Sequence, residues 1–139
     1  MSAVEMTVPD QPDPADRAAI LAGLAAFNAS IAAPGSASLA ILIKQDCATV
    51  GGLWGTSLYD WLAIELLFVP ENLRGQGIGS RLVRQAEEIA KTRNCIGVWL
   101  DTFSFQGPGF YEKIGYCLAG QIGDHPVGGA RYFLSKRFA

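Results

Sequence analysis

The stretch Val69-Pro70-Glu71-Asn72-Leu73-Arg74-Gly75-Gln76-Gly77-Ile78-Gly79-Ser80 decides how the rest of the chain is interpreted. An apolar run over 62–69 precedes it and an amphipathic run over 78–93 follows it, which predicts a strand, a glycine-rich loop and a helix. Alternate glycines permit a tight turn, and the first N–H groups of a helix lack intrahelical partners. Together with the helix dipole and the Arg74 cation, these N–H groups form a site suited to phosphate oxygens.

Three interpretations of this loop compete. In the first, the glycines only let the helix start pack closely. In the second, Gly75-x-Gly77-x-x-Ser80 is a dinucleotide loop, with Asp101 about 20 residues further on as that fingerprint requires. Against the second, Pro70 and four more residues separate the strand from the first glycine, and no further strand–helix–strand unit follows. The absence of a nearby lysine excludes a G-x-x-x-x-G-K-S/T phosphate loop.

The third interpretation is a resemblance. The run Arg74-Gly75-Gln76-Gly77-Ile78-Gly79 resembles the Q/R-x-x-G-x-G/A loop of the GNAT family of N-acetyltransferases, in which this loop binds the diphosphate of coenzyme A. A second run, Gly109-Phe110-Tyr111-Glu112-Lys113-Ile114-Gly115-Tyr116, matches another family motif at the family spacing. Two motifs at that spacing favour this interpretation, and the resemblance is strongest over 62–116.

Length and pattern predict a single α/β domain. The chain has 139 residues, of which 50% are hydrophobic, enough for one buried core. Helical periodicity follows Asp13-Pro14, a short strand is predicted over 3–8, and the unit around the loop predicts a parallel strand pair. Further strands are expected over 39–44, 49–56, 95–101, 117–121 and 131–137, with a short helix over 109–114. The resemblance implies one N-acetyltransferase domain over 1–139, with a mixed, mostly antiparallel sheet, helices on both faces and a central splayed parallel pair.

Charge and cysteine usage exclude several classes of protein. A net charge of −2 provides no electrostatic footprint for nucleic acid or an anionic membrane. No apolar run reaches the roughly 18 residues of a membrane span, and the N-terminus lacks a signal pattern. Cys47, Cys95 and Cys117 have apolar neighbours in the sequence, which favours reduced core thiols in the cytoplasm. Without a C-x-x-C motif, and with one histidine, no zinc site is expected.

The resemblance implies acetyl-CoA as the cofactor. It assigns the diphosphate to Arg74, Gly75, Gln76, Gly77, Ile78, Gly79 and Ser80, and the pantetheine arm and thioester to main-chain groups of Leu67, Phe68 and Val69. A splayed strand leaves such N–H groups unpaired. The family often has asparagine seven residues before the motif tyrosine. This chain has Ser104 there, which is the candidate to replace the asparagine contact.

Two residues are the candidates for proton transfer. Glu65 is the sole ionisable group of the strand over 62–69. Its burial would raise the pKa of the carboxyl and make it a better base, whereas a paired Glu65 would be merely structural. Tyr111 matches the tyrosine that the family places near the coenzyme sulfur as a general acid, because a phenol with a pKa near ~10 is protonated at pH 7. The alternative for Tyr111 is a core aromatic.

The acceptor pocket is less defined. Trp54, Tyr59 and Trp61 are candidates to line it, and Asp101 and His125 are candidates to attract a cation, although each also fits a structural or exposed position. The predicted function is direct transfer of an acetyl group from acetyl-CoA to a primary amine of a small molecule, a protein lysine or an N-terminus. A homodimer is common in the family. A non-catalytic coenzyme-A-binding sensor or interaction module is the alternative, and a nicotinamide-dependent oxidoreductase is a more distant one.

Overall fold

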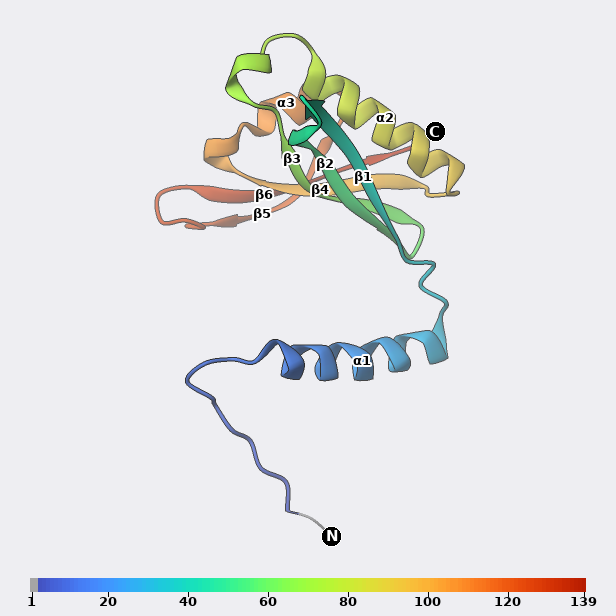
Figure 1. The fold of residues 1–139 in the computed structure, drawn as a ribbon, viewed down its shortest axis with the longest axis vertical. Coiled ribbons are helices and arrows are strands. Elements are labelled where there is room, and N and C mark those ends of the chain that lie inside the picture. Colours follow the sequence, from blue (N-terminus) through green and yellow to red (C-terminus); the bar gives the residue numbers. More distant parts are fainter. Residues whose placement is uncertain (1–2) are drawn as a thin grey trace. The chain divides into compact units, whose positions relative to one another are not determined.

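The computed structural model describes residues 3–139, which divide into two compact units, one ending at Pro34 and one spanning Gly35–Ala139 (Figure 1). The first unit contains helix α1, Pro14–Ile31. Its predicted start is confirmed, because Asp13 Oδ1 accepts a hydrogen bond from the Ala15 N–H at 2.9 Å and Pro14 is the first helical residue. The strand predicted over 3–8 is wrong, since these residues have no regular secondary structure.

The second unit is built on a six-stranded sheet with the order β1-β2-β3-β4-β6-β5. Neighbouring strands are antiparallel except for β3 and β4, which are parallel. The predicted mixed, mostly antiparallel fold class is confirmed. The strands are β1 (Ala37–Gln45), β2 (Ala48–Leu58), β3 (Trp61–Phe68), β4 (Gly97–Phe103), β5 (Cys117–Gly123) and β6 (Ala130–Arg137).

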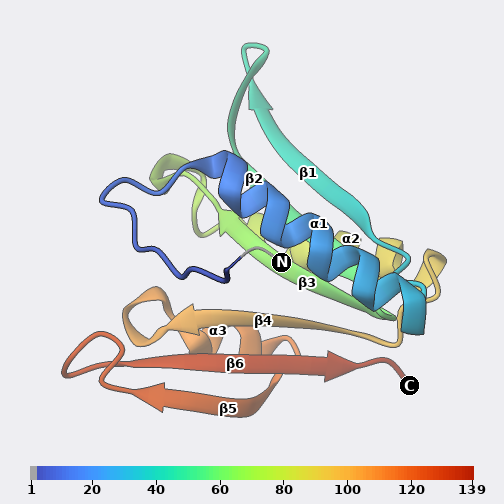
Figure 2. The same ribbon diagram turned by 90° about the horizontal axis from the view of Figure 1, so that it is seen from below.

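Helices α2 (Ile78–Thr92) and α3 (Pro108–Lys113) lie on the same face of this sheet (Figures 1 and 2). The predicted apolar stripe of α2 is buried through Leu82, Val83, Ala86 and Ala90. It packs against fully buried side chains from the middle strands, Leu53, Leu62, Val98, Leu100 and Leu134. Burial of each such leucine or valine is worth roughly 1.5–3 kcal/mol, so this layer anchors the start of α2 at the sheet.

The parallel pair is splayed, as predicted. Its register runs from Trp61 opposite Gly97 to Ile64 opposite Leu100, and beyond that point the strands separate (Figure 2). On the other edge of β3, Trp54 lies opposite Leu66 and Gly55 opposite Ile64, so Glu65 is the extra residue of a β-bulge. A bulge bends its strand and turns its side chain to a new direction. The second half of β3 therefore diverges from β4.

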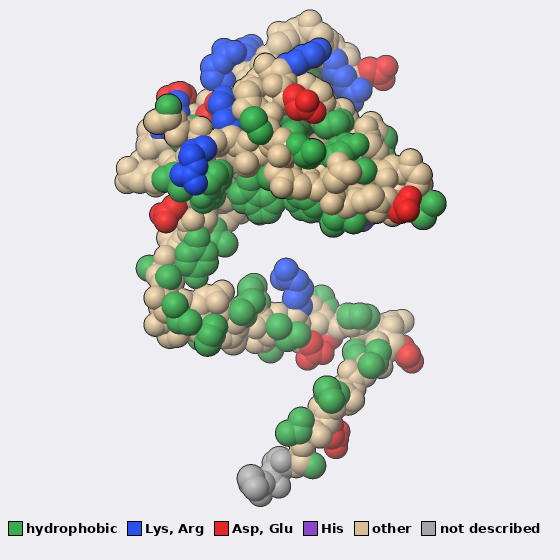
Figure 3. Space-filling view, turned by 180° about the vertical axis from the view of Figure 1, so that it is seen from behind, with side chains coloured by type: hydrophobic (Ala, Val, Ile, Leu, Met, Phe, Trp, Pro, Cys, Tyr) green, Lys and Arg blue, Asp and Glu red, His purple; other side chains and the backbone are tan. Residues whose placement is uncertain are grey.

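The sheet face away from α2 and α3 carries exposed apolar side chains, among them Trp54, Leu66, Phe68 and Trp99. Figure 3 shows hydrophobic side chains gathered along this face. Alternation along the strands accounts for them, since their neighbours point into the core on the α2 side.

The cysteines differ from expectation. All three are free thiols, but Cys95 alone is buried, so the prediction of core thiols is wrong for Cys47 and Cys117. Cys47 lies in the β1–β2 turn and Cys117 begins β5 at the sheet edge, positions that apolar sequence neighbours do not reveal. Burial raises the pKa of the Cys95 thiol. Within residues 3–139, no helix is long and apolar enough to cross a membrane.

Candidate active site

A groove of about 620 Å³ runs between the splayed end of β3, the glycine-rich loop and the segment that leads into α3. Every residue predicted for the diphosphate loop lines it except Gln76, and the three predicted strand residues line it as well: Leu67, Phe68 and Val69. The other wall comes from residues 105–107 and from Phe110 and Tyr111. The two sequence motifs thus form opposite walls of one groove.

The loop conformation requires glycine at two positions. Gly75 and Gly77 have φ angles of +78° and +75°, in the left-handed region that side chains with a Cβ disfavour. The carbonyl of Gly77 accepts the first helical hydrogen bond, from Arg81 N at 3.1 Å. Among the described residues, no side chain caps the start of α2, so its first N–H groups remain available to a ligand.

Gly79 has a different role from the one expected. It lies inside α2, and a Cβ added there would be 3.2 Å from the Phe110 ring. Glycine at this position lets α3 approach the first turn of α2, which brings the two motifs together. Its contribution is close packing rather than an unusual φ angle.

Arg74 adds a cation at the mouth of the groove. Its Nε donates to the Val69 carbonyl at 2.9 Å, and its guanidinium lies 5.9 Å from the centre of the Phe68 ring. These contacts hold the side chain at the end of β3. An uncapped helix start beside a guanidinium fits a diphosphate, so the chain's own residues match the phosphate groups of coenzyme A.

A second cavity, of about 270 Å³, occupies the gap where β3 and β4 separate. It is lined by residues 64–67 of β3, residues 100–103 of β4, Gln106 and Tyr111. Leu67, Gln106 and Tyr111 line both cavities. The groove and the gap therefore meet at these three residues.

Tyr111 lies at that junction with its side chain buried. Burial raises the pKa of its phenol to about 12, so the phenol is neutral at pH 7 and can donate a proton. Its ring contacts those of Phe110 and Tyr116, with centroids 5.0 Å and 6.0 Å away. Tyr116 in turn donates to Glu87 Oε2 at 2.7 Å, which fixes the aromatic group behind Tyr111.

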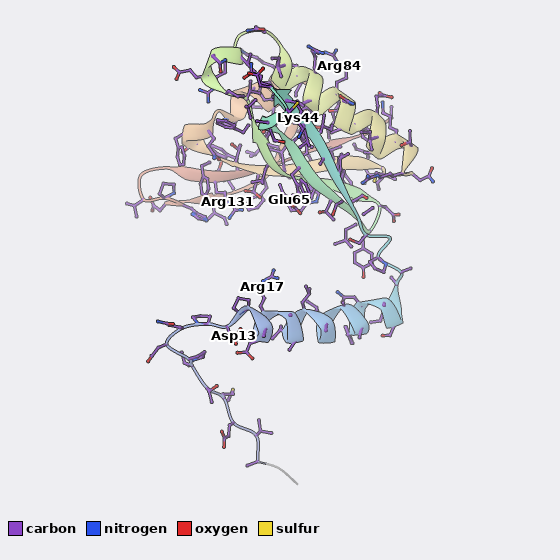
Figure 4. All side chains as sticks on the ribbon, viewed as in Figure 1. Asp13, Arg17, Lys44, Glu65, Arg84 and Arg131 are labelled. Atoms are coloured by element: carbon purple, nitrogen blue, oxygen red, sulfur yellow. The ribbon has the colours of Figure 1, made fainter. Side chains whose placement is uncertain are left out.

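Glu65 lines the second cavity, and its side chain is exposed, so the burial that would have made it a better base is not present. The bulge turns its side chain to the exposed face of the sheet (Figure 4). Its Oε1 accepts from the Thr56 hydroxyl at 2.9 Å, and no described residue forms an ion pair with it. Glu65 is therefore a carboxylate that faces a cavity without a protein cation beside it.

The candidates for cation attraction differ in their surroundings. Asp101 lines the second cavity, but Arg131 lies 2.7 Å (Nη2) and 2.9 Å (Nε) from its Oδ1. The Arg131 guanidinium is 5.4 Å from the ring centres of Phe103 and Phe133. His125, in the β5–β6 turn, contacts the edge of Phe103 with centroids 5.1 Å apart. The charge of Asp101 is thus paired within the protein.

The aromatic candidates are not brought together. Trp54 lies on β2 opposite Leu66, on the exposed face and outside both cavity linings. Tyr59 and Trp61 lie at the other end of β3, where the Trp61 ring packs over Gly97. The structure places these two residues away from the junction.

Ser104 lines neither cavity. Its Oγ accepts from Ala130 N at 3.1 Å, which ties the start of the 3-10 helix η2 (Ser104–Gln106) to β6. The polar residue at the junction is Gln106, which the motif comparison missed. The available signal was a polar side chain directly before Gly107, in the segment that leads to the second motif.

Comparison with known proteins agrees with this geometry. The profile of the acetyltransferase (GNAT) family matches residues 4–116. Blasticidin-S acetyltransferase of Streptomyces morookaense is 45% identical over 87 residues, 62% of this chain and 64% of that protein, so the match spans less than two thirds of it. Acetyltransferase Atu2258 of Agrobacterium fabrum is 42% identical over 101 residues, 72% of this chain and 74% of that protein.

A crystal structure of a candidate acetyltransferase from Agrobacterium tumefaciens has the same fold. It superposes with a TM-score of 0.93 at 35% identity, covering 97% of this chain and 100% of that one. The profile match alone covers well over half of the sequence and includes both motifs that form the groove. The chain belongs to the acetyltransferase (GNAT) family of N-acetyltransferases, whose cosubstrate is acetyl-CoA.

Proposed function

We propose that residues 1–139 act as one N-acetyltransferase domain that moves an acetyl group from acetyl-CoA directly to the primary amine of a small molecule. The observation that carries this proposal is the meeting of the two cavities at Leu67, Gln106 and Tyr111. The groove leads from the helix start to this point, and the gap between β3 and β4 reaches it from the other side. An amine in the gap can then approach a thioester in the groove.

Separate residues bind the coenzyme and transfer the protons. The first N–H groups of α2 and Arg74 bind the diphosphate, and the main-chain groups of Leu67 to Val69 on the edge of β3 that β4 leaves open bind the arm. Acetyl-CoA supplies the acetyl group as a thioester. Glu65 takes one proton of the ammonium, directly or through water, and passes it to solvent, which leaves a neutral amine to attack the thioester carbon. As the C–N bond forms and the C–S bond breaks, Tyr111 donates its phenol proton to the departing sulfur and regains a proton, through water, from the attacking nitrogen, so one proton is released to solvent overall.

The charges support an acceptor with a single ammonium group near the reacting centre. Glu65 has no cation beside it, whereas Asp101 is neutralised by Arg131. A cavity of about 270 Å³ also suits a small amine better than a folded protein surface. Blasticidin-S acetyltransferase, 45% identical to the aligned part of this chain, bears the name of a small-molecule substrate.

The test is an assay of thiol release from acetyl-CoA with a panel of amines, with the acetylated product identified by mass spectrometry. We expect at least one small monoamine to give thiol and product in equal amounts. Glu65→Gln should lower kcat/KM by about a hundredfold, within the range typical of a general base. Glu88→Gln, on the exposed side of α2, is the matched control. Tight coenzyme binding without turnover on any amine would instead indicate a coenzyme-binding module.

A further inference from the structure

Gln106 is held in one orientation at the junction of the two cavities. Its Oε1 accepts from the Phe103 N–H at 2.8 Å, with the Thr102 hydroxyl 3.4 Å away. A backbone N–H can donate only to the amide oxygen, so this contact identifies which end of the amide faces Phe103. The Nε2 group, with two N–H donors, is the other end. Over residues 3–139, no protein acceptor contacts it.

The backbone on both sides restricts this side chain further. Gln106 ends η2, and the next residue, Gly107, turns the chain into α3 with a φ angle of +89°. At the junction its neighbours are Leu67 and the buried phenol of Tyr111. A donor that is positioned before the ligand arrives costs little reorganisation on binding.

The chemistry of Nε2 selects its partner. An amide NH₂ donates and does not accept, so it needs an acceptor atom in the ligand. An ammonium group also only donates, and therefore cannot be that partner. Carbonyl oxygens are the acceptors that coenzyme A would bring to this point, from the amides of its arm or from the thioester.

We propose that the Gln106 amide donates a hydrogen bond to a carbonyl oxygen of acetyl-CoA at the junction. This rests on the proposed function and gives Gln106 the contact for which the family resemblance made Ser104 the candidate. Ser104 is poorly placed for it, because its hydroxyl already accepts from Ala130 N and lines neither cavity. Gln106 is thus a ligand-binding residue of the reaction, two positions beyond the motif position.

Calorimetric titration with coenzyme A and acetyl-CoA, combined with steady-state kinetics, tests the proposal. Gln106→Glu keeps an oxygen for the Phe103 N–H but removes both donors, and Gln106→Ala removes the whole amide. If the partner is an arm amide, the Kd of both ligands rises about five- to tenfold in both variants. If the partner is the thioester, the Kd of coenzyme A stays unchanged and kcat falls by a similar factor.

Controls separate this proposal from fold and charge effects. Gln85→Glu on the exposed side of α2 adds the same charge away from the groove and should behave as wild type. Wild-type Kd and kcat in both Gln106 variants would overturn the proposal, as would a loss that follows Ser104→Ala instead. A wild-type protein that binds no coenzyme A would overturn the proposed function itself, which is a distinguishable result.

Discussion

The two ends of β3 belong to one strand, yet one end is paired with β4 and the other is separated from it. From Trp61 to Ile64 the strand pairs with β4, and Leu62 and Ile64 are buried. From Glu65 to Phe68 it has no partner on the β4 side, and Leu66 and Phe68 are 67% and 56% exposed. The main chain of the first half is paired with β2 on one side and with β4 on the other. The second half still pairs with β2, but its main-chain groups on the β4 side have no strand partner, and a single bulge at Glu65 separates the two halves.

The comparison implies that substitutions at the paired end change stability, whereas those around the splayed end change ligand binding and chemistry. The largest effect is expected for Gly97→Ala at the paired end. Its Cβ would overlap the Trp61 ring and come within 2.6 Å of the Lys136 carbonyl. We expect a loss of about 3 kcal/mol in the free energy of unfolding, measured in urea, with an unchanged coenzyme Kd for the folded protein.

Gly120→Ala on β5 is the control for that experiment, because a Cβ there has open space around it. Equal stability of Gly97→Ala and wild type would show that the Trp61 contact does not hold the strands together at this end.

At the splayed end, Tyr111→Phe should keep the coenzyme Kd and lower kcat about a hundredfold, because the proton for the leaving sulfur is lost. Steady-state kinetics and calorimetry measure the two quantities separately. Tyr132→Phe on β6 removes a hydroxyl outside both cavities and should be neutral. A wild-type kcat in Tyr111→Phe would remove the phenol from the reaction.

The same tyrosine predicts a pH dependence of stability. Burial raises its pKa to about 12 in the folded protein, against 10.0 for an ordinary phenol. Above pH 10 the unfolded chain releases this proton first, so stability falls as the pH rises to 12, by up to about 3 kcal/mol. Tyr111→Phe should lose that part of the dependence in urea unfolding measured between pH 9 and pH 12. Parallel curves for the two proteins would contradict the assignment.

A smaller effect is expected in the loop beyond the splayed end. Gly77→Val forces a β-branched residue to a φ angle of +75° and should raise the coenzyme Kd about tenfold. Gly109→Ala, at a helical position with open space, is the matched control. Unchanged affinity in Gly77→Val, measured by calorimetry, would mean that the ligand does not depend on this turn.

The smallest effect is expected for Arg74→Ala. Removal of one exposed cation should raise the coenzyme Kd about threefold at low salt and less at high salt. Arg84→Ala removes an equivalent charge from the outer side of α2 (Figure 4). If calorimetry shows equal losses in the two variants, general charge rather than a specific phosphate contact is responsible.

Local pattern was sufficient to predict much of the fold. The capped start of α1, the buried stripe of α2 and the turn at Gly75 and Gly77 depend on nearby residues, and each lies where the pattern placed it. The groove could be anticipated because two motifs of one family occur at the family spacing.

The remaining features depend on contacts between distant segments. The bulge that exposes Glu65 arises from the register with β2, which no single strand encodes. The Ser104 hydroxyl accepts a hydrogen bond from Ala130 N, and the Asp101 carboxylate pairs with Arg131. These partners lie 26 and 30 residues further along the chain. The position of Gln106 in the lining of both cavities depends on the folded arrangement of β3, β4 and α3, which the local sequence does not specify.

We expect the amides of the loop and of the splayed half of β3 to bind coenzyme A. Amide chemical shifts of ¹⁵N-labelled protein, followed during titration with coenzyme A, measure this directly. The largest changes should fall on residues 75–80 and on Leu67 and Phe68, while the amides of residues 61–64 stay in place. Unshifted amides over 75–80 at saturating coenzyme A, or changes concentrated at the paired end, would show that these amides do not hold the coenzyme.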